Sequence, residues 1–168
     1  MRPKPGSYPE YFEKYIPLIS ENDLLKALNE NWADLNRVLA EAPAAKHDFA
    51  YAPGKWTLKQ VVLHMIDTER VISYRALRFA RKDPQQPLPF DENQYVAATD
   101  LSNRSLKDLL EEYQTVRFAT TALFKTFSDT TLALSGNTSY GKTTVLALGY
   151  LIAGHSLHHL NVIKQRYL

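Results

Sequence analysis

The segment from Thr143 to Leu168 most constrains how this chain can fold. It contains no proline, and its length and pattern predict one long helix. His155 and His159 stand four residues apart, which places both imidazoles on the same face of that helix. The neighbours of the two histidines at helical spacing are apolar: Leu148, Leu151, Ile152, Val162 and Ile163. Because burying an unpaired polar group is costly, the ring nitrogens need partners, either a metal or a hydrogen-bonding network.

Three earlier segments also carry apolar residues at helical spacing behind a capping residue. They are predicted to be helices at Glu21–Glu41, Leu58–Arg81 and Ser105–Ser128. Their predicted caps are Ser20 with Asp23, Thr57 with Gln60, and Ser105 with Asp108, and the last helix is capped by Thr143 or Thr144. In the third segment the predicted core face is Leu106, Leu109, Leu110, Tyr113, Val116, Phe118, Ala119, Leu123 and Phe127.

The connections between these segments are long. Residues 1–20 hold four prolines among aromatic side chains and predict an irregular arm, lying on the domain or on a second subunit. Residues 83–104 predict a loop with a short helix near Glu92–Ala97, and loops of this size are more often functional than filler. Residues 129–142 are rich in turn residues and allow a short hairpin. We therefore expect one all-α domain, a four-helix bundle over residues 1–168, without requiring an up-down-up-down order.

Composition excludes several classes of site. The chain has no cysteine, so any metal must be held by histidines and carboxylates. Lys and Arg number 20 against 18 for Asp and Glu, and they are scattered, which gives little support for binding nucleic acid or a membrane surface. No secretory signal and no apolar run long enough to span a bilayer is present, so we expect a cytoplasmic protein.

Three histidines are candidates for one metal centre: His64 in the second predicted helix, with His155 and His159 in the last. Three imidazoles with an open fourth position are typical of catalytic zinc, although imidazole also suits nickel, copper and iron. The alternative is that the three rings only hydrogen-bond within the core. His158 is assigned to a place beside this centre or to a subunit contact, and Gly154 to a close approach between helices.

Three charged residues of the second helix share the polar stripe that contains His64. Asp67, one turn away, can orient an imidazole or take up a proton, or it can form an ion pair with Arg70 or Arg75. Arg75 and Arg78 can bind a substrate carboxylate through two parallel hydrogen bonds. For both arginines the alternative is a solvated or ion-paired guanidinium.

Three blocks of the sequence resemble the DinB and YfiT-like superfamily. They are WTLKQVVLHMIDTERVISYRALRFARKD from Trp56, PLPFDENQY from Pro87, and the ending AGHSLHHLNVIKQRYL. The resemblance implies a four-helix bundle, frequently dimeric, with a divalent metal on one histidine of the second helix and an HxxxH pair of the last. These ligands correspond to His64, His155 and His159. Some members are S-transferases or isomerases that use thiols such as bacillithiol or mycothiol, and others are described as metal-dependent hydrolases.

We therefore expect a metal-dependent enzyme, with zinc or nickel as the metal and iron or manganese as alternatives. The leading prediction is transfer of a low-molecular-weight thiol to a small electrophilic substrate, because no obvious general base accompanies the histidines and a metal-bound thiol ionises without one. Hydrolysis of a small amide or ester, and metal or ligand binding without turnover, are the alternatives. We also expect a homodimer, with Leu63, Ile66 and the aromatic arm as parts of its interface.

Overall fold

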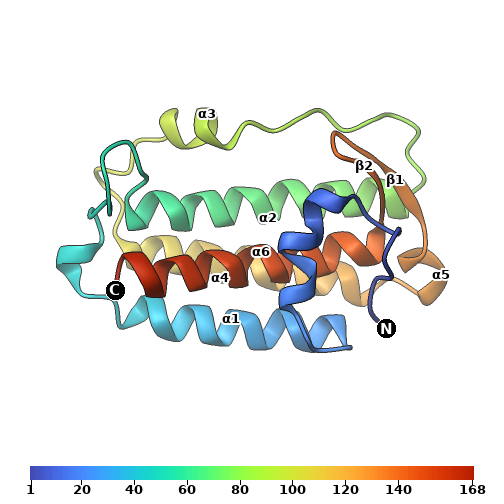
Figure 1. The fold of residues 1–168 in the computed structure, drawn as a ribbon, viewed down its shortest axis with the longest axis horizontal. Coiled ribbons are helices and arrows are strands. Elements are labelled where there is room, and N and C mark those ends of the chain that lie inside the picture. The colour runs from blue at the N-terminus through green and yellow to red at the C-terminus, as the bar shows by residue number, and fades with distance from the viewer.

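The computed structural model describes residues 1–168 and consists of four long helices packed side by side (Figure 1). Their bounds are α1 Leu24–Ala40, α2 Leu58–Ala80, α4 Leu106–Lys125 and α6 Val145–Arg166. This arrangement confirms the predicted all-α four-helix bundle. The only sheet is a hairpin of two short strands.

Hydrogen-bonded caps fix where α2, α4 and α6 begin. The Thr57 hydroxyl accepts a hydrogen bond from the Gln60 backbone N–H, and the Gln60 side chain accepts one from the Thr57 N–H. Ser105 and Asp108 form the same reciprocal pair before α4. Thr144 caps α6 alone. These side chains satisfy backbone donors that a helix leaves unpaired at its first turn, so the three predicted starts are confirmed.

The predicted start of α1 is wrong by three residues. The capping residue is Asp23, whose carboxylate accepts from the Lys26 N–H, and the helix begins at Leu24. Glu21 lies outside the helix and uses its own carboxylate to accept the Asp23 backbone N–H. The Asp23 carboxylate caps the helix as an acceptor and also places a negative charge at the helix N-terminus, which the helix dipole favours.

Consecutive helices are not all neighbours in this bundle. Both α1 and α2 pack chiefly against α4 and α6, so α1 and α2 occupy opposite corners. Figure 1 shows that α2 and α4 run in the same direction, whereas α6 runs opposite to them. The connection from α2 to α4 must therefore return along the whole bundle. It passes over α2 and contains α3 (Glu92–Ala97), with the bounds that the sequence predicts.

The connection from α4 to α6 contains a short helix that the sequence did not predict and a hairpin that it allowed. The short helix is α5 (Asp129–Leu132), and the strands are β1 (Ser135–Thr138) and β2 (Gly141–Thr144), which pair antiparallel. Gly141 has φ of 128°, a conformation that side-chain-bearing residues rarely adopt. The hairpin ends directly at the cap of α6 and so fixes where that helix begins.

The N-terminal arm lies on the bundle, as one of the two predicted alternatives requires. It forms two short 3₁₀ turns, η1 (Glu10–Lys14) and η2 (Ile16–Leu18), and buries Phe12 and Ile16 against the core. A Cβ atom on Gly154 would overlap the carbonyl oxygen of Tyr15. The close approach predicted for Gly154 therefore exists, but it is made with the arm.

Two predicted exposures are corrected by the packing. Leu63 and Ile66 are buried, at 4% and 0% exposure, so they cannot form a subunit interface, and the homodimer itself stays a prediction. On α4, Phe118 is 57% exposed, and Arg117 takes the inward position at 1% exposure. The predicted core residues Leu106, Leu109, Leu110, Tyr113 and Val116 are buried, but after Val116 the inward positions of the helix are Arg117, Thr120 and Phe124 instead of Phe118, Ala119 and Leu123.

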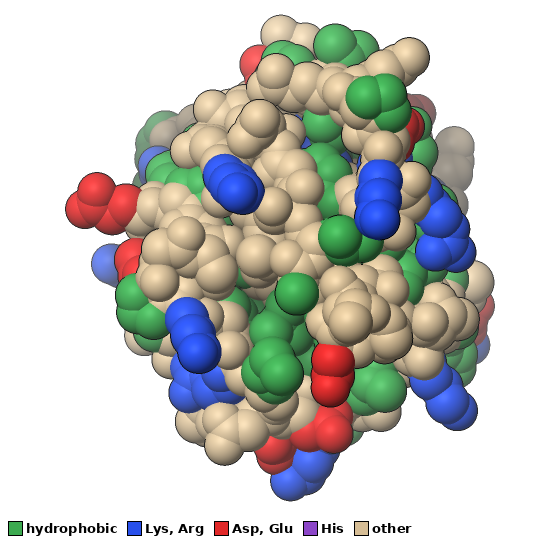
Figure 2. Space-filling view, turned by 90° about the vertical axis from the view of Figure 1, so that its right-hand side faces the viewer, with side chains coloured by type: hydrophobic (Ala, Val, Ile, Leu, Met, Phe, Trp, Pro, Cys, Tyr) green, Lys and Arg blue, Asp and Glu red, His purple; other side chains and the backbone are tan.

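The surface shows no continuous charged region at the hairpin end of the bundle. Figure 2 views this end and shows basic and acidic side chains mostly scattered among apolar and neutral ones, with no histidine visible. None of the helices combines the length and the apolar character needed to cross a bilayer.

Candidate metal centre

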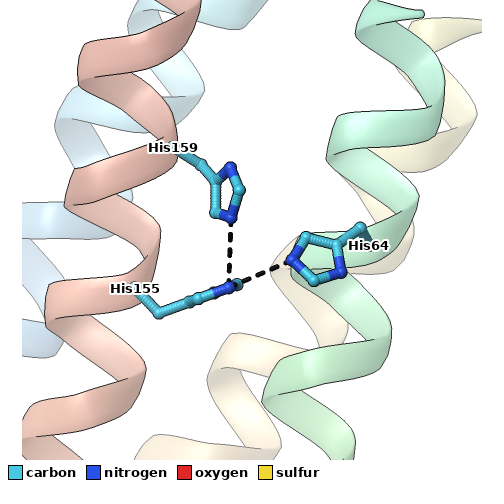
Figure 3. A group of neighbouring side chains, drawn as sticks. All are labelled: His64, His155 and His159. Atoms are coloured by element: carbon cyan, nitrogen blue, oxygen red, sulfur yellow. Dashed lines mark hydrogen bonds between the residues drawn. The ribbon is translucent and has the colours of Figure 1, made fainter. Parts of the chain in front are cut away.

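Helices α2 and α6 bring three histidines together inside the bundle (Figure 3). The Nε2 atom of His155 lies 3.1 Å from Nε2 of His64 and 3.1 Å from Nε2 of His159. One ligand atom from each ring lies within 4.8 Å of the others. The predicted juxtaposition of His64 with the HxxxH pair is therefore present in the structure.

Hydrogen bonds alone leave this cluster poorly satisfied. Each neutral imidazole nitrogen carries either one proton or one in-plane lone pair. Nε2 of His155 faces two other Nε2 atoms, yet it can make only one well-directed hydrogen bond. Three unprotonated Nε2 atoms instead direct three lone pairs at one region. In a tetrahedral zinc site the nitrogen atoms are about 3.4 Å apart, close to the two separations here. The donor set fits a divalent metal.

Burial keeps the three imidazoles neutral. It lowers the pKa of His64 to about 4 and that of His159 to about 3. Burial also lowers the pKa of His155 well below its ordinary value, and His159, His64 and His158 add to the effect. Because imidazole binds a metal only in its unprotonated form, the cluster is ready to act as a ligand at neutral pH. No carboxylate belongs to the cluster, so a bound metal would keep its full positive charge.

Thr68, and not Asp67, contacts the imidazole of His64. The Thr68 hydroxyl lies 3.3 Å from Nδ1 of His64, which leaves Nε2 free to face the cluster. Asp67 forms an ion pair with Arg70 at 3.5 Å and does not line the cavity beside the histidines. The structure thus shows the alternative considered for Asp67. Contacts of the Thr68 kind orient metal-binding histidines in general.

Aromatic rings enclose the cluster. Trp56 lies against His64 with ring centroids 4.8 Å apart, and Tyr15 of the arm meets His155 edge to face at 5.4 Å. His158 contacts Tyr15 at 5.3 Å and stays outside the group of converging nitrogens. The arm reaches this position because Gly154 leaves room for its backbone. These rings cover part of the imidazole surface with aromatic side chains.

A cavity of about 300 Å³ extends from the histidines along one face of α2. His64, Thr68, Val71 and Arg75 line it, and their spacing of four, three and four residues places them in one row over three turns. The opposite walls come from the arm, the α2–α4 connection, the hairpin and α6. They include Tyr11, Phe12, Lys14, Tyr15, Phe90, Glu92, Ser139, Tyr140 and Leu151. Sequence reasoning did not assign these residues, although it noted the aromatic arm and the long loop.

The two arginines predicted to bind substrate differ in their surroundings. Arg75 is 9% exposed, lines the cavity and makes one hydrogen bond, from Nη2 to the Leu88 carbonyl oxygen at 2.9 Å. Burial lowers its pKa, but an arginine stays charged at neutral pH. Arg78 forms an ion pair with Asp83 at 2.8 Å and does not line the cavity. Only Arg75 is placed to meet a bound molecule.

A second cavity, of about 340 Å³, reaches the same cluster from another side. It shares Trp56 and His159 with the first cavity and adds Lys55, Asn93 and His158 among its lining residues. Two separate spaces therefore meet at the imidazole of His159.

The model of the DinB superfamily matches residues 27–163, which hold all three histidines. The chain belongs to the DinB superfamily. The four-helix bundle and the HxxxH pair of α6 are thus features of a DinB-superfamily protein. No curated protein matches the chain.

Solved structures share the fold of this DinB-superfamily chain. YfiT from Bacillus subtilis, a probable metal-dependent hydrolase with an unusual four-helix bundle topology, matches with a TM-score of 0.77 and 22% identity, over 98% of this chain and 90% of YfiT. A mycothiol-dependent maleylpyruvate isomerase matches with a TM-score of 0.69 and 12% identity, over 86% of this chain and 61% of the isomerase. The DinB-like YjoA of Bacillus subtilis matches with a TM-score of 0.60 and 13% identity, over 87% of this chain and 90% of YjoA. At these identities the likeness shows the fold.

Proposed function

We propose that this chain is a divalent-metal enzyme that transfers a low-molecular-weight thiol to a small electrophilic substrate. His64, His155 and His159 would hold the metal, with zinc or nickel as the first candidates. The observation that carries the proposal is the set of three converging, neutral Nε2 atoms with no carboxylate among them. A divalent ion bound there acts as a Lewis acid of undiminished charge and lowers the pKa of a thiol or a water.

The two cavities favour a reaction with two organic substrates. Both lead to His159, so a thiol and an electrophile can approach the centre from different sides. Trp56 lines both spaces and lies against His64, where it can contact both reactants. A mycothiol-dependent isomerase shares this fold over 61% of its length, which supports a thiol as one of the substrates. In the net reaction the thiol sulfur forms a bond to the electrophilic carbon, and the thiol proton passes to the product or to the leaving group.

Hydrolysis of a small amide or ester is the second candidate. Glu92 lines the first cavity and supplies a carboxylate that could accept a proton from water. YfiT, which has the same fold, is itself described as a probable metal-dependent hydrolase. The choice between the two reactions depends on whether a thiol or water attacks.

The test combines two assays on the zinc-loaded and the nickel-loaded chain. The first measures conjugation of monochlorobimane with cysteine, glutathione, coenzyme A, bacillithiol and mycothiol, and the second measures hydrolysis of a p-nitrophenyl ester. We expect conjugation with at least one thiol, lost on chelation and in His159→Ala. His47→Ala is the matched control, because it removes an imidazole that lies outside the cluster and lines neither cavity. Absence of conjugation with every thiol, together with chelator-sensitive hydrolysis, would favour the second candidate.

Metal content tests both reactions at once. The chain, purified without a polyhistidine tag and reconstituted with zinc, should hold about one equivalent, and His159→Ala should hold far less. A wild-type chain that retains well below one equivalent of zinc and of nickel would remove both enzymatic proposals and leave a bundle without metal chemistry.

A further inference from the structure

Arg75 is a buried positive charge without a counter-ion. It is 9% exposed, and no carboxylate lies within ion-pair distance of its guanidinium. Its one hydrogen bond goes to a neutral carbonyl oxygen, that of Leu88. Buried charges in proteins are ordinarily paired, because an unpaired charge loses its hydration without compensation. By contrast, Arg70, Arg78 and Arg117 all have carboxylate partners.

The position of Arg75 directs this free charge at the cavity that leads to the histidines. Arg75 lies eleven residues after His64 on the same face of α2, a rise of about 16 Å between the two Cα atoms. Both residues line the same cavity, and Nη2 of Arg75 donates to the Leu88 carbonyl oxygen at 2.9 Å. The cavity therefore has the candidate metal centre at one end and a cation at the other.

The surface between the two ends is mostly apolar and aromatic. Val71, Ile72, Phe90 and Leu151 line it, and Tyr140 stacks on Tyr11 at a centroid separation of 4.1 Å near its wall. Lys14 adds a second positive charge, whereas Glu92 is the only acidic side chain among the lining residues. With a divalent ion on the histidines, the cavity is strongly positive overall. An anion with an apolar body complements it.

We propose that the electrophilic substrate carries a carboxylate, which Arg75 binds at the end of the cavity remote from the three histidines. The planar guanidinium matches a carboxylate through two parallel hydrogen bonds, and a single arginine balances its single negative charge. An apolar segment of several atoms then lies along the row of Thr68 and Val71 and brings the reactive carbon to the metal centre. This assignment names the substrate class and rests on the proposed function for the reaction.

Binding measurements test the assignment without turnover. The probes are 3-phenylpropanoate, its neutral analogue 3-phenylpropanamide, and phenyl phosphate, titrated calorimetrically into the zinc-loaded chain. We expect the carboxylate to bind at least about tenfold more tightly than the amide, as charge-assisted hydrogen bonds imply. Arg75→Gln should abolish that preference without changing zinc content. Arg78→Gln is the matched control and should retain it, because Arg78 faces Asp83 and does not line the cavity.

The same titrations identify the outcomes that overturn the assignment. Equal binding of 3-phenylpropanoate and 3-phenylpropanamide by the wild-type chain would overturn the assignment without the need for any variant. A preference that survives Arg75→Gln but disappears on chelation would place the carboxylate on the metal. Tighter, Arg75-dependent binding of phenyl phosphate would replace the carboxylate by a phosphate.

Two further measurements keep the assignment separate from other effects. Arg75→Lys retains a charge and a donor for the Leu88 carbonyl oxygen, and it should keep part of the preference if Arg75→Gln is too unstable to titrate. An intact preference in a chain that conjugates no thiol would support the carboxylate site while the proposed function fails.

Discussion

Two groups of polar side chains are buried in this bundle, and their hydrogen bonding differs. At the first, Arg117 donates from Nε and Nη2 to Glu69, with contacts of 2.7–3.1 Å, and from Nη1 to the Leu28 carbonyl oxygen at 2.7 Å. Ser156 and Asn31 accept further hydrogen bonds from the same guanidinium. Residues of all four long helices thus meet at one satisfied ion pair.

The three-histidine cluster lies next to this ion pair in the sequence, but its hydrogen bonding is incomplete. His155 precedes Ser156 on α6, and His64 lies five residues before Glu69 on α2. Yet the three Nε2 atoms face one another, with no carboxylate among them. The hydrogen-bonding capacity of the Arg117–Glu69 group is filled by contacts within the fold. The histidine cluster, by contrast, keeps three lone pairs available for a ligand. Burial of polar groups alone therefore does not identify a functional site, whereas incomplete hydrogen bonding of buried polar groups does.

Removing the carboxylate of Glu69 gives the largest expected effect on stability. Glu69→Ala leaves the Arg117 charge buried and unpaired, and we expect a loss of about 3–5 kcal/mol in the free energy of unfolding. Urea unfolding at pH 7 measures it. Glu30→Ala is the control, because the exposed Glu30–Lys26 pair contributes at most about 1 kcal/mol. Equal losses in the two variants would contradict a structural role for the ion pair.

Acid should destabilise the metal-free protein through the histidines. Burial lowers the pKa of His64 to about 4, so between pH 6.5 and pH 4 the unfolded chain binds more protons than the folded chain. The neutral imidazole of His64 contributes fully to stability above pH 6.5. Between pH 6.5 and pH 4 the free energy of unfolding should fall by about 3 kcal/mol from His64 alone. Urea unfolding from pH 7 to pH 4 measures this slope.

The control for the acid effect is His64→Met, which should show a shallower dependence on pH. Arg117 stays protonated over this range and contributes no slope of its own. An unchanged slope in the variant would mean that other groups cause the acid sensitivity.

Metal binding should stabilise the fold through the histidine cluster only. Zinc at a free concentration of about 100 times its Kd should raise the free energy of unfolding by about 2.7 kcal/mol. His159→Ala should abolish this gain, and His158→Ala should preserve it. Thermal unfolding with and without zinc measures both. A gain that persists in His159→Ala would place the metal elsewhere.

Loss of the Thr68 hydroxyl should have the smallest of these effects. Thr68→Val removes the contact that holds His64 in orientation, and we expect a tenfold to hundredfold weaker metal affinity, about 1.4–2.7 kcal/mol. Competition with a zinc-binding dye measures the affinity. Thr120→Val removes another buried hydroxyl, one that contacts Ser73 far from the cluster, and should leave the affinity unchanged. Equal affinities for Thr68→Val and the wild type would show that Thr68 does not orient the ligand.

Much of the fold was predictable because its signals are local. Thr57 with Gln60 and Ser105 with Asp108 mark helix starts through contacts within one turn, and α3 follows from its flanking loop residues. The order of the helices around the bundle was not predictable. Periodicity shows which face of a helix is buried, but it does not show that α1 faces α4 and α6. Arg117 was missed for the same reason, since its partner lies 48 residues away.

The candidate site was predictable in its ligands and less so in its surroundings. His64, His155 and His159 interrupt apolar faces, and this is visible in the sequence. Asp67 and Thr68 lie three and four residues after His64, and spacing does not decide between them. Asp67 was predicted to orient the imidazole because carboxylates often have this role, but its carboxylate forms an ion pair with Arg70. The contacts of Tyr15 and Glu92 with the cavity depend on loops whose paths no local signal specifies.

The sequence separation of the three imidazoles would determine when in folding the proposed centre can bind a metal. His155 and His159 are preformed as a pair once α6 is helical, but His64 joins them across 91 residues. Contacts of such long range form late in folding, after the entropy of closing the intervening chain has been overcome. His155 and His159 on an isolated helix would bind an ion weakly, and His64 becomes available as a third ligand only when α2 packs against α6. Under the proposed assignment, ion uptake would follow assembly of the helices, and a tightly held ion would mark a chain that has reached its native topology.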